Sequence, residues 1–170
     1  MKLRRDLFVA VVIVTALLLQ VDVLNRLQLP IGRPDLVVVC VIGFALTGGS
    51  QRGAIIGFLA GLALDLMPPA DHTAGRIAFA YTVVGYFAGL LEDIEERSIL
   101  TTVAVVGAGA GAAVLLYAGI GALIGDPRVT VGATTHSLVA AVVYDVVLAP
   151  FVVPLISGAD RRLEPAGGPR

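Results

Sequence analysis

The chain has 170 residues, of which 57% are hydrophobic and only 15% are charged. Soluble domains carry about 25% charged residues, so this composition excludes an ordinary soluble domain and indicates a membrane protein. Twelve basic and 13 acidic residues leave a formal net charge of -1, which gives no electrostatic case for binding nucleic acid. One cysteine and two histidines also exclude a disulfide framework and a recognisable zinc cluster.

The hydropathy pattern predicts an all-α integral membrane protein with about six transmembrane helices, since each span needs about 20 mostly apolar residues. The apolar run from Leu7 to Leu24 follows basic residues without a small-residue cleavage site, which predicts an uncleaved first span. Later spans are predicted from about Thr73 to Leu91, from Ile99 to Ile124 and from Ser137 to Ile156.

The residues from Leu36 to Met67 form two short apolar runs separated by Gly48-Gly49-Ser50-Gln51-Arg52. About fifteen helical residues reach only about 22 Å, against about 30 Å of hydrocarbon. The possible interpretations are two short spans in a locally thinned bilayer, a re-entrant hairpin buried in protein, and one long tilted helix. The paired glycines and the charged Arg52 make the long helix the weakest of the three.

Residues 1–157 are predicted to form a single polytopic membrane domain, with no room for a separate soluble domain. Asp71 or Thr73 is the expected N-cap of the span that ends near Leu91. Pro150 and Pro154 are expected to interrupt the last span. Residues 158–170, rich in Gly, Pro and charged residues, are predicted to be a short, disordered cytoplasmic tail.

The distribution of basic residues predicts that both termini are cytoplasmic, because Lys and Arg near the spans stay on that side. With the N-terminus inside, the inner basic residues are Lys2, Arg4, Arg5, Arg52, Arg97, Arg161, Arg162 and Arg170. The outer ones are Arg26, Arg33, Arg76 and Arg128. The excess on the inner side persists if the segment around Arg52 is re-entrant.

Gly53, Gly57, Gly61 and Asp65 recur every four residues and therefore share one face of a helix. Small residues let helix backbones approach closely in lipid, where no hydrophobic force drives helices together. This face indicates either packing inside the protein or docking of a partner's span. The same spacing recurs on the next predicted span, at Gly85 and Gly89.

Asp65 and Asp145 are carboxylates within apolar sequence. A charged side chain at mid-membrane costs about 2.5 to 3.5 kcal/mol on insertion scales, which makes both functional candidates. Asp65 lies close to the predicted outer boundary and has donors in the following loop or helix start, including His72, Thr73 or Arg76. Its role is therefore either structural or in binding a partner or ligand. Asp145 lies near mid-depth, where it is protonated, hydrogen-bonded to a neighbouring hydroxyl or exposed to a polar cavity.

The sequence predicts no enzyme and no cofactor, because no Ser or Cys stands with a His and a carboxylate in a recognisable catalytic motif. His72 and His136 are predicted in separate outer loops, which argues against a shared metal site. Two intramembrane carboxylates would suit a proton- or ion-coupled transporter, but no span carries a polar stripe to line a path. The acidic stretch Glu92 to Glu96 is expected to be a solvated helix end, with a protein-docking patch as the alternative.

Residues 30 to 91 carry an ordered set of motifs. Pro34-Asp35 begins an apolar run, a Gly-x-x-x-Gly-Phe-x-x-Gly-Leu-x-x-Asp pattern ends at Asp65, and Gly75 precedes Gly85-Tyr86-Phe87-Ala88-Gly89. In order and spacing these motifs resemble the bacterial rod shape-determining MreD family, a polytopic family of similar length. The remaining parts of the chain are similar to that family in hydropathy.

The resemblance implies a non-enzymatic, multi-pass subunit of the bacterial inner (cell) membrane, belonging to the elongasome, the peptidoglycan synthesis machinery that determines cell shape. It implies binding to the bitopic protein MreC and a complex with the shape-type glycosyltransferase and transpeptidase. The family is similar in fold to the substrate-binding membrane subunits of energy-coupling-factor vitamin transporters, which supply the alternative function. The predicted outer loops are short and contain no Trp to stack on a heterocycle, which favours the scaffold.

Overall fold

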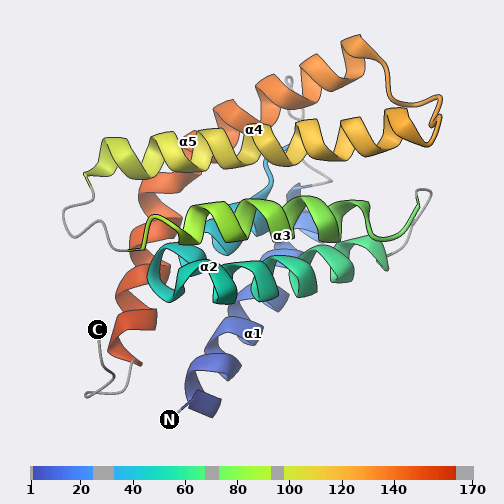
Figure 1. Cartoon of the computed structure of the whole chain (residues 1–170). Coiled ribbons are helices and arrows are strands. Elements are labelled where there is room, and N and C mark those ends of the chain that lie inside the picture. Colours follow the sequence, from blue (N-terminus) through green and yellow to red (C-terminus); the bar gives the residue numbers. More distant parts are fainter. Residues whose placement is uncertain (1, 25–32, 68–72, 93–97, 164–170) are drawn as a thin grey trace.

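The computed structural model describes residues 2–24, 33–67, 73–92 and 98–163. These residues form five α-helices and one short π-helix, η1 (Figure 1). The elements in chain order are α1 (Lys2–Leu18), η1 (Leu19–Leu24), α2 (Leu36–Asp65), α3 (Arg76–Gly89), α4 (Ile99–Leu123) and α5 (Val131–Arg162). Three of them, α2, α4 and α5, are long and apolar enough to cross a membrane. The prediction of an all-helical membrane protein agrees with these helices.

Helix α2 turns back on itself near its middle. Gly49 has φ 79° and ψ 176°, a conformation outside the helical region that glycine adopts readily because it lacks a Cβ. Eight residues of continuous helix would separate Ala45 from Gly53 by about 12 Å. A Cβ added at Gly53 would instead lie 2.6 Å from the Ala45 Cβ. The two halves of α2 therefore lie side by side (Figure 1), and the interpretation as one long tilted helix is wrong.

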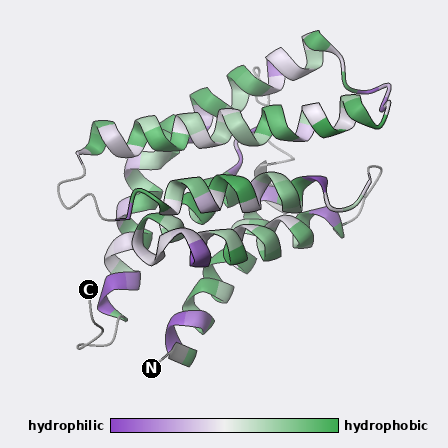
Figure 2. Cartoon of the chain, viewed as in Figure 1, coloured by the Kyte–Doolittle hydropathy of each residue, from purple (hydrophilic) through white to green (hydrophobic). Residues whose placement is uncertain are grey.

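The first half of α2 forms the centre of the protein. Every residue from 37 to 47 is buried, and α1, α3 and α5 pack against α2 while α4 packs on α3 and α5. In its most apolar window α2 is 67% buried, against 22% for α4. Figure 2 shows α4 as mostly hydrophobic along its length. Because so little of this helix is buried, much of its apolar surface faces outward, as expected for a helix in contact with lipid.

Helix α5 is longer than the sequence predicted at both ends. It begins at Val131 rather than Ser137, so His136 lies on a helix and not in an outer loop. It runs unbroken through Pro150 and Pro154. It ends at Arg162, so residues 158–162 are helical and the predicted disordered tail begins too early. Residues 164–170 lie outside the described residues.

Helix α3 begins differently from the prediction. Its N-cap is Gly75, in a left-handed conformation with φ 96° and no side chain to bond the helix start. Of the two predicted caps, Thr73 lies before the observed cap, and Asp71 lies outside the described residues together with His72. Most of the acidic stretch, from residue 93 onward, also lies outside the described residues. The acceptor for the start of α3 comes instead from another helix.

Candidate functional site

The glycine face of α2 packs against α3 within the protein. A Cβ added at Gly57 would overlap the backbone carbonyl of Tyr81, and one at Gly61 would lie 2.6 Å from the Cα of Ala78. Gly53 and Gly85 meet backbone to backbone in the same way. These contacts define an α2–α3 glycine seam, which leaves no room for a partner's helix on this face.

The seam continues to the turn of α2. A Cβ added at Gly89 would overlap the backbone of Gly49 and Ser50. The end of α3 is therefore fixed against the point where α2 reverses. All five glycines singled out in the sequence lie in this seam: Gly53, Gly57, Gly61, Gly85 and Gly89.

Asp65, at the end of α2, closes the other end of the seam by capping α3. Its carboxylate accepts hydrogen bonds from the backbone N–H groups of Gly75 at 2.9 Å, Ile77 at 3.3 Å and Ala78 at 2.9 Å. The first N–H groups of a helix have no partner inside the helix and carry partial positive charge, so a carboxylate stabilises them. The side chain is only 1% exposed. The geometry accordingly gives Asp65 a structural role.

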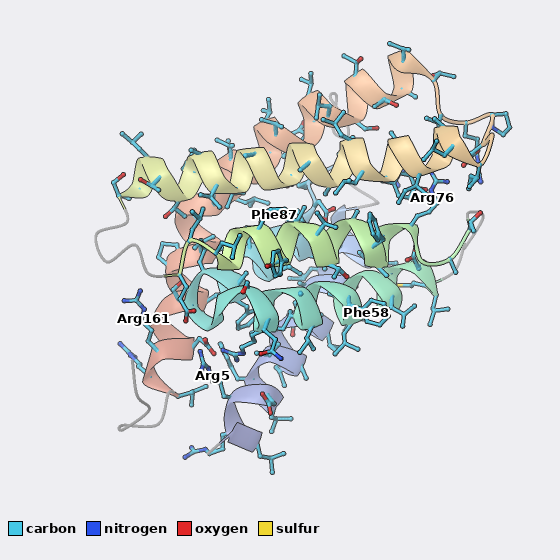
Figure 3. All side chains as sticks on the ribbon, in the orientation of Figure 1. Arg5, Phe58, Arg76, Phe87 and Arg161 are labelled. Carbon is cyan, nitrogen blue, oxygen red and sulfur yellow. The ribbon has the colours of Figure 1, made fainter. Side chains whose placement is uncertain are left out.

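Arg76 occupies the start of α3, at the opposite end of the molecule from Arg5 and Arg161 (Figure 3). Its guanidinium donates to the Asp126 carboxylate at 2.7 Å and to the Tyr117 carbonyl at 2.9 Å, and it lies 3.9 Å from the Tyr117 ring centroid. The hydrogen bond from Arg76, joined by those from Arg128, lowers the pKa of Asp126 from 3.8 to about 2. Arg76 thus ties the start of α3 to the end of α4.

Asp145 lies at the middle of α5 and is fully buried. One of its carboxylate oxygens accepts a hydrogen bond from the backbone N–H of Asp35 at 2.7 Å. Asp35 caps α2 by accepting from the N–H of Val38 at 3.2 Å, and it also accepts from the Tyr81 hydroxyl. The central cluster of Asp35, Tyr81 and Asp145 therefore joins α2, α3 and α5. A hydrogen bond from a neighbouring hydroxyl is one of the three expectations for Asp145, and its donor among the described residues is instead a backbone N–H.

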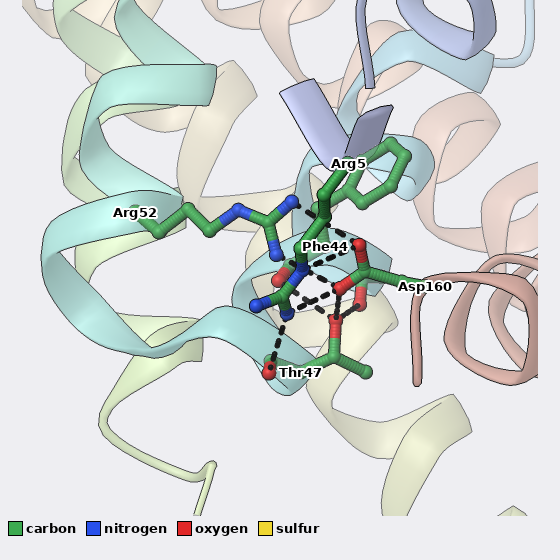
Figure 4. A network of polar contacts seen from close by, with 6 residues as sticks. Arg5, Phe44, Thr47, Arg52 and Asp160 are labelled. Atoms are coloured by element: carbon green, nitrogen blue, oxygen red, sulfur yellow. Dashed lines mark hydrogen bonds and ion pairs between the residues drawn. The ribbon is translucent and has the colours of Figure 1, made fainter. Parts of the chain in front are cut away.

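A third buried carboxylate, Asp160, joins both ends of the described chain to the turn of α2 (Figure 4). Arg5 and Arg52 donate to it at 2.6 and 2.8 Å, and the Thr47 hydroxyl donates at 2.9 Å. Asp160 has no exposed surface, while the Arg5 and Arg52 side chains are 15% and 19% exposed. We call these four residues the terminal cluster.

Sequence reasoning missed the terminal cluster because it assigned Asp160 to a disordered tail. The available signal was helical spacing: Ala149, Val153 and Ile156 are buried on one face of α5, and Asp160 continues that face. A carboxylate at a buried helical position needs cationic or hydrogen-bond donors. Nothing in the local sequence identified Arg5 and Arg52 as those donors.

An apolar groove of about 280 Å³ runs between α3 and α4. Its α3 side is formed mainly by aromatic and branched side chains, and its α4 side mainly by small residues. The wall includes Val83, Phe87, Leu91, Val105, Ala108 and Ala112. Phe87 is 62% exposed. Among the described residues, no group of three or more His, Cys, Asp or Glu side chains is arranged to hold a metal ion.

Comparisons with known protein families, with curated proteins and with solved structures found no match to this chain.

Proposed function

We propose that this protein is a non-enzymatic scaffold subunit of a rod shape-determining complex in the bacterial inner membrane. It binds an MreC-like bitopic protein and, with it, the shape-type glycosyltransferase and transpeptidase that build the lateral wall. The motif that resembles the MreD family supports this proposal, because its positions have identifiable packing roles in the structure. Its glycines allow α2 and α3 to meet backbone to backbone, and its aspartate caps α3.

The observation that carries the proposal is the groove between α3 and α4. Since α3 already covers the glycine face of α2, a partner's span needs another surface. Ala104, Ala108 and Ala112 recur every four residues on α4, and the first two are exposed. Small residues at this spacing favour close helix approach in lipid. Phe87, on the α3 side of the groove, supplies a large apolar contact beside them.

The topology that accompanies this proposal has six helical segments, with both termini and the turn of α2 on the cytoplasmic side. Arg5, Arg52 and Asp160 meet at one end of the molecule, and Arg161 lies near them (Figure 3). Basic residues concentrate on the cytoplasmic side of membrane proteins. Because α2 begins beside Asp145, in the middle of α5, its first half reaches only part of the depth that α5 covers. The second span is therefore short.

The experiment is purification of the tagged full-length protein from its native membranes after mild crosslinking, with mass spectrometry of the partners. We expect recovery of an MreC-like protein and cell-wall synthases. Recovery of paired ATPases with a transmembrane coupling subunit would overturn the proposal in favour of vitamin uptake.

A matched pair of variants on α4 tests the groove itself. Ala108→Leu fills the groove, whereas Ala122→Leu makes the same change at an exposed site outside it. We expect Ala108→Leu to reduce recovery of the bitopic partner at least about tenfold, which corresponds to about 1.4 kcal/mol, and Ala122→Leu to leave it unchanged. Equal recovery with both variants would place the partner on another surface.

A further inference from the structure

Asp145 is the one buried carboxylate whose hydrogen-bonding capacity is left half unused among the described residues. Its Oδ1 accepts from the Asp35 N–H, but its Oδ2 is buried and has no partner. Both oxygens of an ionised carboxylate accept hydrogen bonds, so this environment supplies a donor to only one of the two. A buried oxygen with no donor is costly if it carries negative charge.

The groups that face Asp145 do not supply a compensating cation. On α2, Asp35 is itself a carboxylate and Cys40 lies buried just beyond it. On α3, Tyr81 lies at the same junction, and its hydroxyl donates to Asp35. From η1, Gln20 contributes an uncharged side chain that accepts from the Val37 N–H at 3.0 Å. In the described contacts, no Lys, Arg or His side chain donates to Asp35 or Asp145.

The two carboxylates differ in their donors, which decides where a proton resides. Asp35 accepts from the Val38 N–H and from the Tyr81 hydroxyl, and both bonds stabilise its charged form. Asp145 accepts only from the backbone N–H of Asp35. Two neighbouring carboxylates in an apolar interior do not both ionise readily. A neutral carboxyl also costs far less than a charge when one oxygen lacks a partner.

We propose that the central cluster is a proton-binding site, in which Asp145 carries a proton on Oδ2 at neutral pH while Asp35 remains ionised. The proton comes from water and returns to it, and no other co-reactant is needed. Release of the proton places two negative charges between the start of α2 and the middle of α5.

Infrared spectroscopy of the full-length protein in a detergent that contains no carbonyl group tests the proposal directly. A neutral carboxylic acid has a carbonyl stretching band that an ionised carboxylate lacks. We expect the wild-type protein to show this band at neutral pH and Asp145→Asn to lose it. Asp160→Asn is the matched control, because Asp160 is ion-paired with Arg5 and Arg52 and its replacement should leave the band in place.

Absence of the band in the wild-type protein at neutral pH, or its persistence in Asp145→Asn, would overturn the proposal. Loss of the band in Asp35→Asn alone would assign the proton to Asp35 and overturn it as well. Asp145→Glu keeps an acid at this position and should retain the band, which separates loss of the proton site from loss of folding.

Thermal unfolding provides a second readout. If Asp145 is protonated in the folded state and ionised in the unfolded state, the folded state binds more protons. Its stability then falls as the pH rises from about 4, where an ordinary aspartic acid ionises, and levels off once the folded state has released the proton. We expect this decrease in the wild-type protein and a flatter profile in Asp145→Asn. An equal slope in both proteins would contradict the proposal.

Discussion

Asp65, at the end of α2, and Asp145, in the middle of α5, are equally buried, with exposed fractions of 1% and 0%. Their surroundings are nevertheless opposite. Asp65 faces the start of a helix and accepts from N–H groups of Gly75, Ile77 and Ala78. Asp145 faces another carboxylate residue and accepts from one N–H group. The supply of donors, rather than burial, therefore separates a structural carboxylate from one that is available to bind a proton.

The contrast between Asp65 and Asp145 depends first on the α2–α3 glycine seam, which brings Asp65 to the start of α3. Gly57→Leu places a side chain into the backbone of Tyr81, which cannot move without displacing α3. We expect a loss of more than about 3 kcal/mol of stability and little folded protein. The measurement is the yield of monodisperse protein by size-exclusion chromatography in detergent. Gly119→Leu is the control, because a Cβ there meets nothing within 4 Å; equal yields of the two variants would contradict the seam.

Replacing the two carboxylates tests the comparison itself. Asp65→Ala leaves N–H groups at the start of α3 without their acceptor, and we expect a loss of about 2 kcal/mol. Asp145→Asn keeps the acceptor for Asp35 and removes an unsatisfied acid, so we expect little or no loss. Thermal unfolding in detergent measures both variants. In a growth and cell-shape assay, Asp65→Ala should also be more harmful than Asp145→Ala, and equal tolerance at the two positions would contradict this ranking.

Asp160 extends the comparison to a carboxylate served by charged donors. Asp160→Asn leaves Arg5 and Arg52 without their shared anion, and we expect a loss of about 2 kcal/mol in the free energy of unfolding. This loss is smaller than for a fully buried ion pair because both arginines are partly exposed to solvent. Arg52→Gln should cost about 1 kcal/mol, since Arg5 still compensates Asp160. A double-mutant cycle of Arg52 and Asp160 by thermal unfolding checks the coupling; strictly additive effects would show that the two side chains do not interact.

The smallest expected effect is at Asp126, an acid outside the spans. Its pKa is lowered from 3.8 to about 2, first by the hydrogen bond from Arg76. A lowered pKa in the folded state means that the stabilising contribution is complete above about pH 4 and is lost as the pH falls towards about 2. Asp126→Asn should lose this acid-dependent part, seen as a shallower fall of the unfolding temperature between about pH 5 and pH 2. An unchanged profile would contradict the ion pair with Arg76.

Most of the helices follow from apolar run length. The prediction of a span from Ile99 to Ile124 is within one residue of α4, Ile99–Leu123, because Ser98 caps its start and the polar segment from Gly125 follows its end. The end of α5 was less predictable. The composition of residues 158–170 indicates disorder, but Asp160 is held by two arginines that lie more than 100 residues away in sequence.

The candidate sites divide in the same way. Four-residue spacing identified the glycines correctly as one helix face, but it did not distinguish internal packing from partner docking, since both require the same small residues. The sequence allowed the interpretation that Asp65 accepts hydrogen bonds from the start of the next helix. It could not show that the donors are backbone N–H groups, because that depends on α2 and α3 meeting at that end. The Asp35–Asp145 contact spans 110 positions in the sequence and had no local signal.

The sequence by itself determined that this is a helical membrane protein with a glycine face and two carboxylates in apolar surroundings. Those properties depend on composition and on short periodic spacing, which are local. The tertiary structure decided that the glycine face is occupied by α3, that α2 reverses at Gly49, and that Asp65 and Asp145 meet different donors. Hydrogen-bond supply at a buried carboxylate depends on which helices meet there, and that is fixed only when the chain packs.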